Sequence, residues 1–269
     1  MIDETFSVRN EIVVVTGASG QLGVEYCDTF LRNGAKVVGL DLRSNPNIME
    51  LVSRYNSNFH FIQCDITKKS SLIKASSEIK DKFGIITVLI NNAAIDSPPD
   101  APIEETGPFE EYPEASWDKV MDVNVKGVFL TCQIFGSIMA KHNNGSIINI
   151  SSIYGIVSPD QSLYDYRRRR GEVFYKPVAY SASKSALLNL SRYLAVYWAK
   201  ENVRVNTLVI AGVFNGQDRD FLEAYCKRIP IGRMASHKEY NGTLIFLASK
   251  ASQYMTGSQV TVDGGWTAI

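Results

Sequence analysis

Cysteine, excess charge and long apolar runs are all scarce in this chain of 269 residues. No two of its cysteines have the spacing of metal ligands; they are Cys27, Cys64, Cys132 and Cys226. We expect buried, reduced thiols and no metal site. Lys plus Arg equals Asp plus Glu, at 28 each. This balance argues against a nucleic-acid-binding protein driven by bulk charge, although local patches stay possible.

No apolar run approaches the roughly 18 residues that a membrane helix needs. The segment Met1–Glu11 is polar and carries no hydrophobic secretion signal. We therefore expect a cytoplasmic protein without a membrane partner. Hydrophobic residues at 45% and charged residues at 21% fit an ordinary globular protein with a sizeable core.

Short apolar runs alternate with amphipathic stretches along the chain. Most of these runs are β-branched and continuously apolar, as strands covered on both faces require. The predicted strands are Ile12–Val15, Lys36–Leu40, Phe59–Gln63, Ile86–Ile90, Ser146–Ile150, Val203–Val209 and Gln259–Val262. Helical patterns fill the intervals: Leu22–Asn33, Ser70–Phe83, Ser116–Lys141, Ser181–Lys200 and a helix from the capping box Ser236/Glu239 to Ser249. The alternation predicts an α/β fold, a doubly wound parallel sheet of the Rossmann type, in a single domain of residues 1–269.

Two segments interrupt the alternation and are predicted to be substrate-loop insertions, residues 95–113 and 153–177. The first is rich in proline and acidic residues. The second holds several tyrosines and the run Arg167–Arg170. Loops of this length inside a compact domain are usually functional or mobile.

A glycine-rich turn, Thr16–Gly23, lies between the first strand and the first helix. Glycines let the backbone approach a pyrophosphate, and the helix N-terminus adds its positive dipole end. A glycine cluster alone can be a purely structural turn, but this position favours a dinucleotide site. Asp41, at the end of the second strand, can accept hydrogen bonds from the adenosine ribose and would repel the extra phosphate of NADP. We expect NAD in preference to NADP, although Arg43 could soften that preference.

Tyr180 and Lys184 stand four residues apart at the start of a predicted helix and so share one helix face. A nearby ammonium stabilises a phenolate and lowers the pKa of a tyrosine from its usual value of about 10. The pair therefore indicates acid/base chemistry near neutral pH. Taken alone, this spacing also arises by chance on the surface of an amphipathic helix.

With its other motifs, the chain resembles the single-domain branch of the short-chain dehydrogenase/reductase family over nearly its whole length. The matching motifs, in the family's order, are Gly17/Gly20/Gly23, Asp41, Cys64–Thr67, Asn91–Ala94, Val123–Val125, Ile150–Ser152, Tyr180/Lys184 and Val262–Gly265. The resemblance implies that Tyr180 exchanges a proton with the substrate oxygen. It implies that Lys184 lowers the pKa of Tyr180 and holds the nicotinamide ribose. It implies that Ser152 orients the reacting group and that Asn124 holds a water linking Lys184 to solvent.

The resemblance also implies a set of cofactor-binding residues. With Tyr180 and Lys184 these are Gly17, Ser19, Gly20, Gln21, Leu22, Gly23, Asp41, Leu42, Asp65, Ile66, Asn92, Ala93, Ala94, Val213 and Asn215. Gln21 stands where many relatives carry glycine, and Ala94 replaces the last glycine of Asn-Asn-Ala-Gly. Ile210–Ala211 replaces the usual Pro-Gly after the sixth strand. Val213 then falls where a backbone amide commonly meets the nicotinamide carboxamide, and Asn215 where threonine is common.

The largest departure is the separation of Ser152 and Tyr180, 28 residues, which is longer than in most of the family. The extra residues must loop out between two catalytic groups, so we expect them near the substrate mouth. They include Tyr154, Tyr164, Tyr166, Arg167–Arg170 and Tyr175. Arginine binds phosphate and carboxylate in a bidentate manner, which favours an anionic, polyhydroxylated substrate such as a sugar phosphate, nucleotide sugar or sugar acid. The arginines could equally form a solvated surface or a subunit contact.

The insertion, with Tyr175–Tyr180, Gly212–Asp218 and Trp266–Ala268, resembles the flagellin-modification and gluconate-dehydrogenase-like surface-sugar oxidoreductases of the family. We expect an NAD(H)-dependent oxidoreductase acting on a secondary alcohol or ketone of an anionic sugar derivative. The alternatives are a reductase of a non-sugar carbonyl, such as an acyl thioester or lipid, and a nucleotide-binding sensor or scaffold without turnover. Relatives are commonly homodimers or homotetramers built on the helices after the fourth and fifth strands.

Overall fold

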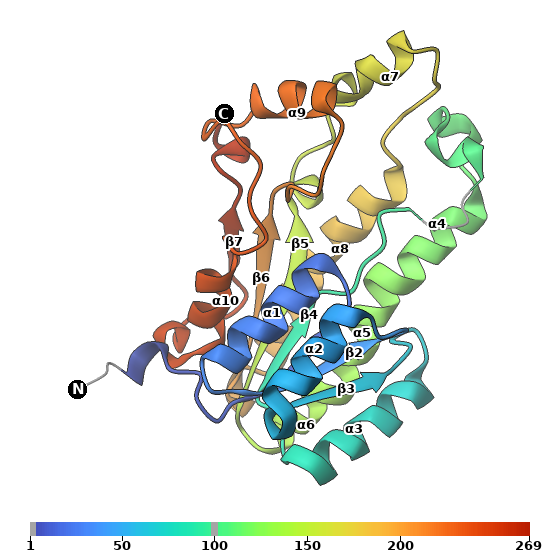
Figure 1. Ribbon diagram of the computed structural model, residues 1–269. Helices are drawn as coiled ribbons and strands as arrows, with labels where there is room; N and C mark the ends of the chain where they lie inside the picture. The colour runs from blue at the N-terminus through green and yellow to red at the C-terminus, as the bar shows by residue number, and fades with distance from the viewer. Residues whose placement is uncertain (1–3, 98–101) are drawn as a thin grey trace.

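A seven-stranded parallel sheet forms the middle of the molecule in the computed structural model, which describes residues 4–97 and 102–269 (Figure 1). Its strands are β1 (Ile12–Thr16), β2 (Lys36–Asp41), β3 (Phe59–Gln63), β4 (Val88–Asn91), β5 (Gly145–Ser152), β6 (Val203–Ile210) and β7 (Gln259–Val262). They lie in the order β3-β2-β1-β4-β5-β6-β7, and each neighbouring pair is parallel. The predicted doubly wound sheet is confirmed.

Helices cover both faces of this sheet. The helices of the structure are α1 (Gln21–Arg32), α2 (Pro46–Tyr55), α3 (Lys69–Phe83), α4 (Glu114–Met121), α5 (Val128–Thr131), α6 (Ser137–Lys141), α7 (Asp165–Arg169), α8 (Val178–Tyr197), α9 (Arg219–Cys226) and α10 (Asn241–Ala248). Of these, α7 and α9 lie beyond the strand ends rather than on a face (Figure 1). Successive strand residues point to opposite faces. Val13 and Val15 therefore pack in the core under α1, α2 and α10, whereas Val14 packs in the core under α3, α5, α6 and α8.

The predicted long helix Ser116–Lys141 is one helical stretch, Glu114–Lys141, in which two π-helical segments separate α4, α5 and α6. By length and composition alone this stretch could cross a membrane, contrary to the prediction that no apolar run comes near that length. Its residues Leu130, Phe135 and Met139 are buried in the core against the sheet. Half of the apolar window of this stretch is buried in this way.

Two predicted helix starts differ from the structure. The helix predicted from the Ser236/Glu239 capping box begins only at Asn241, as α10, although Glu239 does accept a hydrogen bond from the Ser236 N–H (2.8 Å). Helix α8 begins at Val178 rather than Ser181, so Tyr180 lies in its first turn. Helix α2 was not predicted, although its start is encoded locally: the Asn45 side chain accepts a hydrogen bond from the Ile48 N–H (2.9 Å), and Pro46 occupies the first helical position. The 153–177 insertion is not wholly irregular, because it contains α7, which lies beside α9 beyond the C-terminal ends of β5 and β6 (Figure 1).

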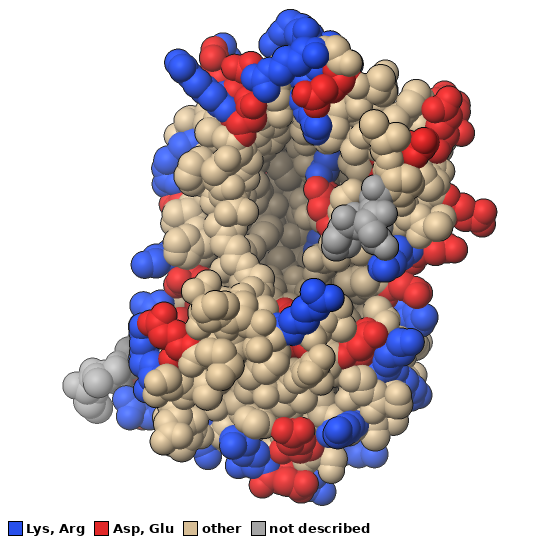
Figure 2. Space-filling model, turned by 45° about the vertical axis from the view of Figure 1, so that its right-hand side comes forward, with Lys and Arg blue, Asp and Glu red and all other residues tan. Residues whose placement is uncertain are grey.

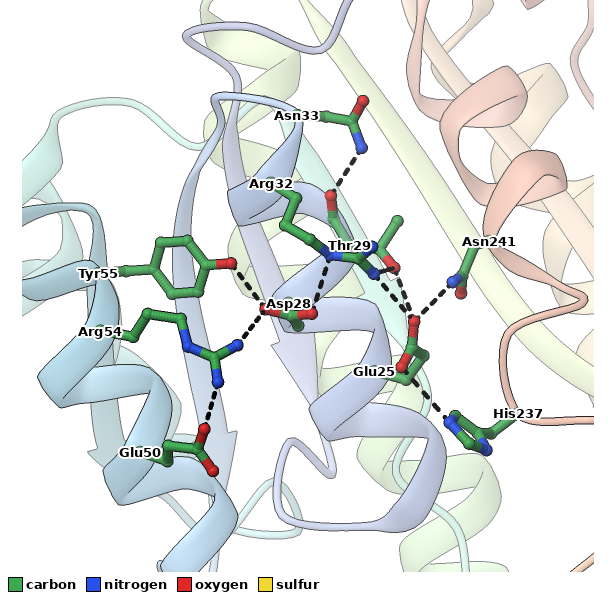
Figure 3. Close-up of polar contacts among 10 residues, drawn as sticks. All are labelled: Glu25, Asp28, Thr29, Arg32, Asn33, Glu50, Arg54, Tyr55, His237 and Asn241. Atoms are coloured by element: carbon green, nitrogen blue, oxygen red, sulfur yellow. Dashed lines mark hydrogen bonds and ion pairs between the residues drawn. The ribbon is translucent and has the colours of Figure 1, made fainter.

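A polar network holds α1 against α2 and α10 (Figure 3). Glu25 is 8% exposed. Its carboxylate accepts hydrogen bonds from Arg32 (3.1 Å) and from Asn241 of α10 (2.7 Å). Asp28, one turn along, accepts a hydrogen bond from Tyr55 of α2 (2.8 Å). These contacts fix the helix that follows the glycine-rich turn, and so fix the turn itself.

Candidate active site

The sequence-predicted residues gather at the C-terminal edge of the sheet. The strand order reverses between β1 and β4, and such a switch point is where parallel sheets bind ligands. A cavity of about 380 Å³ opens there. The predicted cofactor residues that line it are Gly17, Gly20, Gln21, Leu22, Asp41, Leu42, Asp65, Ile66, Asn92, Ala93 and Ala94.

The glycine-rich turn approaches the end of β4 too closely for any side chain. Gly17 has a φ of +65°, and a Cβ on it would lie 2.7 Å from Ala93 Cα. A Cβ on Gly23 would lie 2.0 Å from the Gly17 carbonyl oxygen. Gly23 does not line the cavity, but its missing side chain lets α1 start directly behind the turn.

Thr16 joins the turn to β4 and was missed as a site residue. Its Oγ1 accepts hydrogen bonds from the Asn92 and Ala93 N–H groups, both at 3.1 Å. In return the Asn92 side-chain amide donates to the carbonyls of Thr16 (3.0 Å) and Gly17 (3.2 Å). The two walls of the cavity are thereby set at a fixed separation.

The Asp41 carboxylate lines the cavity at the end of β2. It accepts hydrogen bonds from the backbone N–H groups of Ser19 (2.9 Å) and Leu42 (2.7 Å), which orient it. Ser19 itself does not line the cavity, and its hydroxyl donates to the Arg43 carbonyl (2.6 Å). A carboxylate held in this way can accept hydrogen bonds from a pair of hydroxyls and repels an anion.

Gln21, at the position where glycine was expected, bridges the cavity's edge to the segment after β6. Its Nε2 donates to the Phe214 carbonyl at 3.0 Å. Val213, in the same segment, lines a second cavity, whereas Asn215 is exposed and lines neither. The structure therefore brings Val213, but not Asn215, to the site.

The second cavity, of about 330 Å³, contains the predicted catalytic residues Ser152 and Tyr180. Leu22 lines both cavities, so the two adjoin. Four tyrosines or phenylalanines share the catalytic cavity with Tyr180: Tyr154, Tyr164, Phe221 and Tyr225. Figure 2 shows a deep hollow whose walls are mostly uncharged, between rims that carry interspersed acidic and basic side chains.

Lys184 follows Tyr180 by one turn of α8 and is 4% exposed. Its Nζ donates to the Ile150 carbonyl (2.9 Å) and lies 5.7 Å from the centre of the Tyr180 ring. Desolvation lowers the pKa of Lys184 to about 8, while the negative charge of Asp96 opposes that shift. Burial raises the pKa of the Tyr180 phenol, Asp96 raises it further, and a hydrogen bond with Ser152 lowers it.

Asn124 lies in the π-helical segment Asp122–Gly127 and is fully buried. Its Nδ2 donates to the Ile95 carbonyl (2.8 Å) and to Ser183 Oγ (2.9 Å), and its Oδ1 accepts from the Ile95 N–H (2.8 Å). Both amide hydrogens are therefore used, and the side chain ties the segment after β4 to α8. The water-holding role stays a prediction.

The arginine run lies outside both cavities. Arg167 pairs with Glu172, Arg168 with Asp165, and Arg170 with both Asp218 and Asp220. These ion pairs fasten the insertion to itself and to the start of α9.

Two side chains at or next to the catalytic cavity were missed: Asp96 lines it, and Lys176, which does not, forms an ion pair with Asp96. Lys176 Nζ also lies 5.2 Å from the centre of the Tyr180 ring. The available signals were weak. Asp96 follows the Asn91–Ala94 motif closely, and Lys176 stands four residues before Tyr180.

Comparisons with known proteins agree with this geometry. Residues 17–267 match the family model described as enoyl-(acyl carrier protein) reductase. The NAD-dependent glycerol dehydrogenase of Listeria innocua is 32% identical, over 98% of this chain and 97% of its own length. The 2-dehydro-3-deoxy-D-gluconate 5-dehydrogenase of Dickeya dadantii is 30% identical over the whole of both chains. Post-translational flagellin modification protein A of Campylobacter coli is 29% identical, over 96% of this chain and 99% of its own.

Among solved structures, a short-chain dehydrogenase from Leptospira borgpetersenii with bound NAD⁺ superposes with a TM-score of 0.86. It is 30% identical in sequence, and the match covers 99% of this chain and 97% of that one.

Lys184→Met should stabilise the fold in a pH-dependent way. Because the pKa of Lys184 is about 8 in the folded protein against its ordinary 10.5, the unfolded chain binds more protons between these values. The free energy of unfolding of the wild type therefore rises with pH between these two pKa values. Below the lower value, burying the charged Lys184 destabilises the folded protein to the full extent. The variant's gain in free energy of unfolding, measured by urea denaturation, should be largest near about pH 7 and shrink toward about pH 10. The exposed Lys200→Met is the control, and a gain that does not vary with pH would contradict the prediction.

Proposed function

The chain belongs to the short-chain dehydrogenase/reductase family, and on that premise we propose that this oxidoreductase transfers a hydride between NAD(H) and a secondary alcohol or ketone of a polyhydroxylated compound. The observation that carries the proposal is the meeting of Ser152 and Tyr180 in one cavity that adjoins the Asp41 cavity, with Lys184 directly behind.

The proposed chemistry follows from the positions of three side chains. In the oxidative direction the Tyr180 oxygen takes the proton of the substrate hydroxyl. The Ser152 hydroxyl binds the substrate oxygen that loses this proton. The ammonium of Lys184 stabilises the phenolate, which burial alone disfavours. A dinucleotide held by the residues of the first cavity would supply the hydride-transfer chemistry at the substrate carbon. The sum is one alcohol converted to one ketone, with a hydride and a proton removed.

The residues of the first cavity fit a dinucleotide. A close-packed glycine turn at the start of α1 offers backbone N–H groups to a pyrophosphate, and the oriented Asp41 carboxylate suits a ribose diol. The same carboxylate disfavours a 2′-phosphate, which supports NAD over NADP.

The substrate we propose is a neutral polyol or sugar. Asp96 and several tyrosines line the catalytic cavity, while the arginines that motivated an anionic substrate are paired elsewhere. Tyrosine hydroxyls and a carboxylate suit hydroxyl groups better than carboxylates or phosphates. A sugar acid is the second candidate, favoured by Lys176 near the Tyr180 ring and by the likeness to a gluconate-type dehydrogenase. A place in surface-sugar or flagellin metabolism is supported only by the likeness to a flagellin modification protein.

Oxidation of neutral polyols should be the principal activity. NADH formation is measured from NAD with glycerol, D-threitol, D-sorbitol, D-gluconate and a sugar phosphate, and NADH consumption with an acyl thioester. Tyr180→Phe should lower kcat by about 100-fold or more, because the proton acceptor is lost. Activity confined to anionic sugars would overturn the neutral-substrate proposal. NAD binding without turnover of any compound would favour a sensor.

Asp41→Ala should weaken the binding of NAD and make the affinity for NADP similar to that for NAD. The reason is that the charge that repels the 2′-phosphate is removed. The measurement is calorimetric titration of wild type and variant with both dinucleotides. Asp65→Ala serves as a cavity-lining control that should not change the preference. Equal or tighter NADP binding by the wild type would refute the role given to Asp41.

A homo-oligomer built on α5 and α8 is also proposed. Phe129, Tyr193, Val196 and Tyr197 are large apolar or aromatic side chains on these helices that are between 47% and 81% exposed. Sedimentation should give the mass of a dimer or tetramer, and Tyr193→Glu with Val196→Glu should give a monomer. A wild-type monomer at micromolar concentration would refute this. The cytoplasmic location stays a prediction.

A further inference from the structure

Asp96 is the one charged residue among the described residues that line the catalytic cavity. Its side chain is 51% exposed, so its carboxylate is accessible to a ligand. Burial raises the pKa values of Tyr154, Tyr164 and Tyr180, and the negative charge of Asp96 raises each of them further. The carboxylate therefore lies close to the tyrosines that surround the reacting group.

Lys176 holds one of the two oxygens of this carboxylate. Its Nζ pairs with Asp96 Oδ2, and its side chain is only 12% exposed. Gln161 fixes the Lys176 backbone, because its Oε1 accepts from the Lys176 N–H (2.8 Å) and its Nε2 donates to the Lys176 carbonyl (3.4 Å). Asp96 Oδ1, by contrast, has no hydrogen-bond partner within residues 4–97 and 102–269. A carboxylate has about four acceptor positions, so Asp96 can bind a ligand hydroxyl while the ion pair stays intact.

The other polar side chains on the cavity wall already have partners. Tyr154 and Tyr164 are hydrogen-bonded to each other. The Tyr225 hydroxyl accepts from a backbone N–H (2.8 Å), and the Gln217 amide bonds at both ends to nearby backbone groups. Two further hydroxyls are assigned to the reacting oxygen by the proposed function. Asp96 Oδ1 is therefore the acceptor left for a second group of the substrate.

We propose, on the basis of the proposed function, that Asp96 determines substrate specificity by accepting a hydrogen bond from a second hydroxyl while the first hydroxyl reacts at Tyr180. Lys176 is a positioning residue that holds the carboxylate in place. The site then selects diols and higher polyols over compounds with a single hydroxyl. A substrate carboxylate or phosphate would meet the charge of Asp96, so the same residue disfavours anions.

The experiment measures, by ligand-detected NMR, how tightly a four-carbon series binds to the full chain, with NADH and again without dinucleotide. An alcohol and NADH are both reduced, so no hydride transfer occurs. The series is butan-2-ol, butane-2,3-diol, D-threitol and D-threonate, the anionic counterpart of D-threitol. The wild type should bind the diol and D-threitol about tenfold or more tighter than butan-2-ol, and D-threitol tighter than D-threonate.

Asp96→Asn should change the affinities for D-threitol and D-threonate in opposite directions. D-Threitol binding should weaken by about tenfold or more, because a charged acceptor is lost. D-Threonate binding should become tighter than in the wild type, because Lys176 is left without its counter-charge, and a folding defect cannot produce this gain. Asp165→Asn is the matched control, since that carboxylate is also ion-paired and 49% exposed but does not line the catalytic cavity. It should bind the series like the wild type.

Lys176→Met should weaken D-threitol binding several-fold, and Lys176→Arg should restore it, because arginine also pairs with a carboxylate. Equal affinity of the wild type for butan-2-ol and the two polyols, or a preference for D-threonate over D-threitol, would overturn the proposal. So would loss of both D-threitol and D-threonate binding in Asp96→Asn, which would mean that the ion pair only joins two segments of the chain. Turnover of butan-2-ol and D-threitol with equal kcat/KM would refute the role of Asp96 and leave the oxidoreductase function standing. Selective, Asp96-dependent polyol binding without turnover would support that role and refute the reaction.

Discussion

The site depends on the contact between the glycine-rich turn and the end of β4. Gly17 lies so close to Ala93 that no side chain fits between them, and Thr16 accepts hydrogen bonds from both backbone amides that follow Asn91. From there the segment after β4 continues to Ile95. The Asn124 side chain forms hydrogen bonds with the backbone N–H and C=O of Ile95. Asn124 also reaches α8, the helix that carries Tyr180 and Lys184. Hydrogen bonds at both ends of this segment thus tie the dinucleotide-type cavity to α8, the helix of the predicted catalytic residues.

Tyr180 and Lys184, the predicted catalytic pair, are both affected by burial. Burial alone favours the neutral form of both partners: it lowers the pKa of Lys184 and raises that of Tyr180. An ammonium near a phenolate would favour ionisation of both groups, and Lys184 Nζ lies 5.7 Å from the centre of the Tyr180 ring. Ser152 lowers the Tyr180 pKa, and the Ile150 carbonyl accepts a hydrogen bond from Lys184.

The sequence predicted what is encoded locally. The sheet, the glycine turn and Asp41 follow from strand–turn–helix patterns, which need no knowledge of distant partners. The four-residue spacing of Tyr180 and Lys184 indicated a site only together with the family's other motifs. The Asp96–Lys176 pair was not predicted, because the two residues are 80 positions apart in the sequence and come together only in the folded protein. The arginine run was placed at the mouth, yet its partners Asp218 and Asp220 lie about 50 residues further along and could not be read from the run itself. The α2 helix, by contrast, had a readable Asn-Pro start.

The pairing of those arginines has a consequence for how substrates arrive. A run of unpaired cations beside the mouth would attract anions over a distance of about a Debye length and speed their encounter at low salt. Here Arg167, Arg168 and Arg170 pair with Asp165, Glu172, Asp218 and Asp220. Paired cations attract distant anions less than free ones do, so the run should contribute little long-range steering of an anionic substrate.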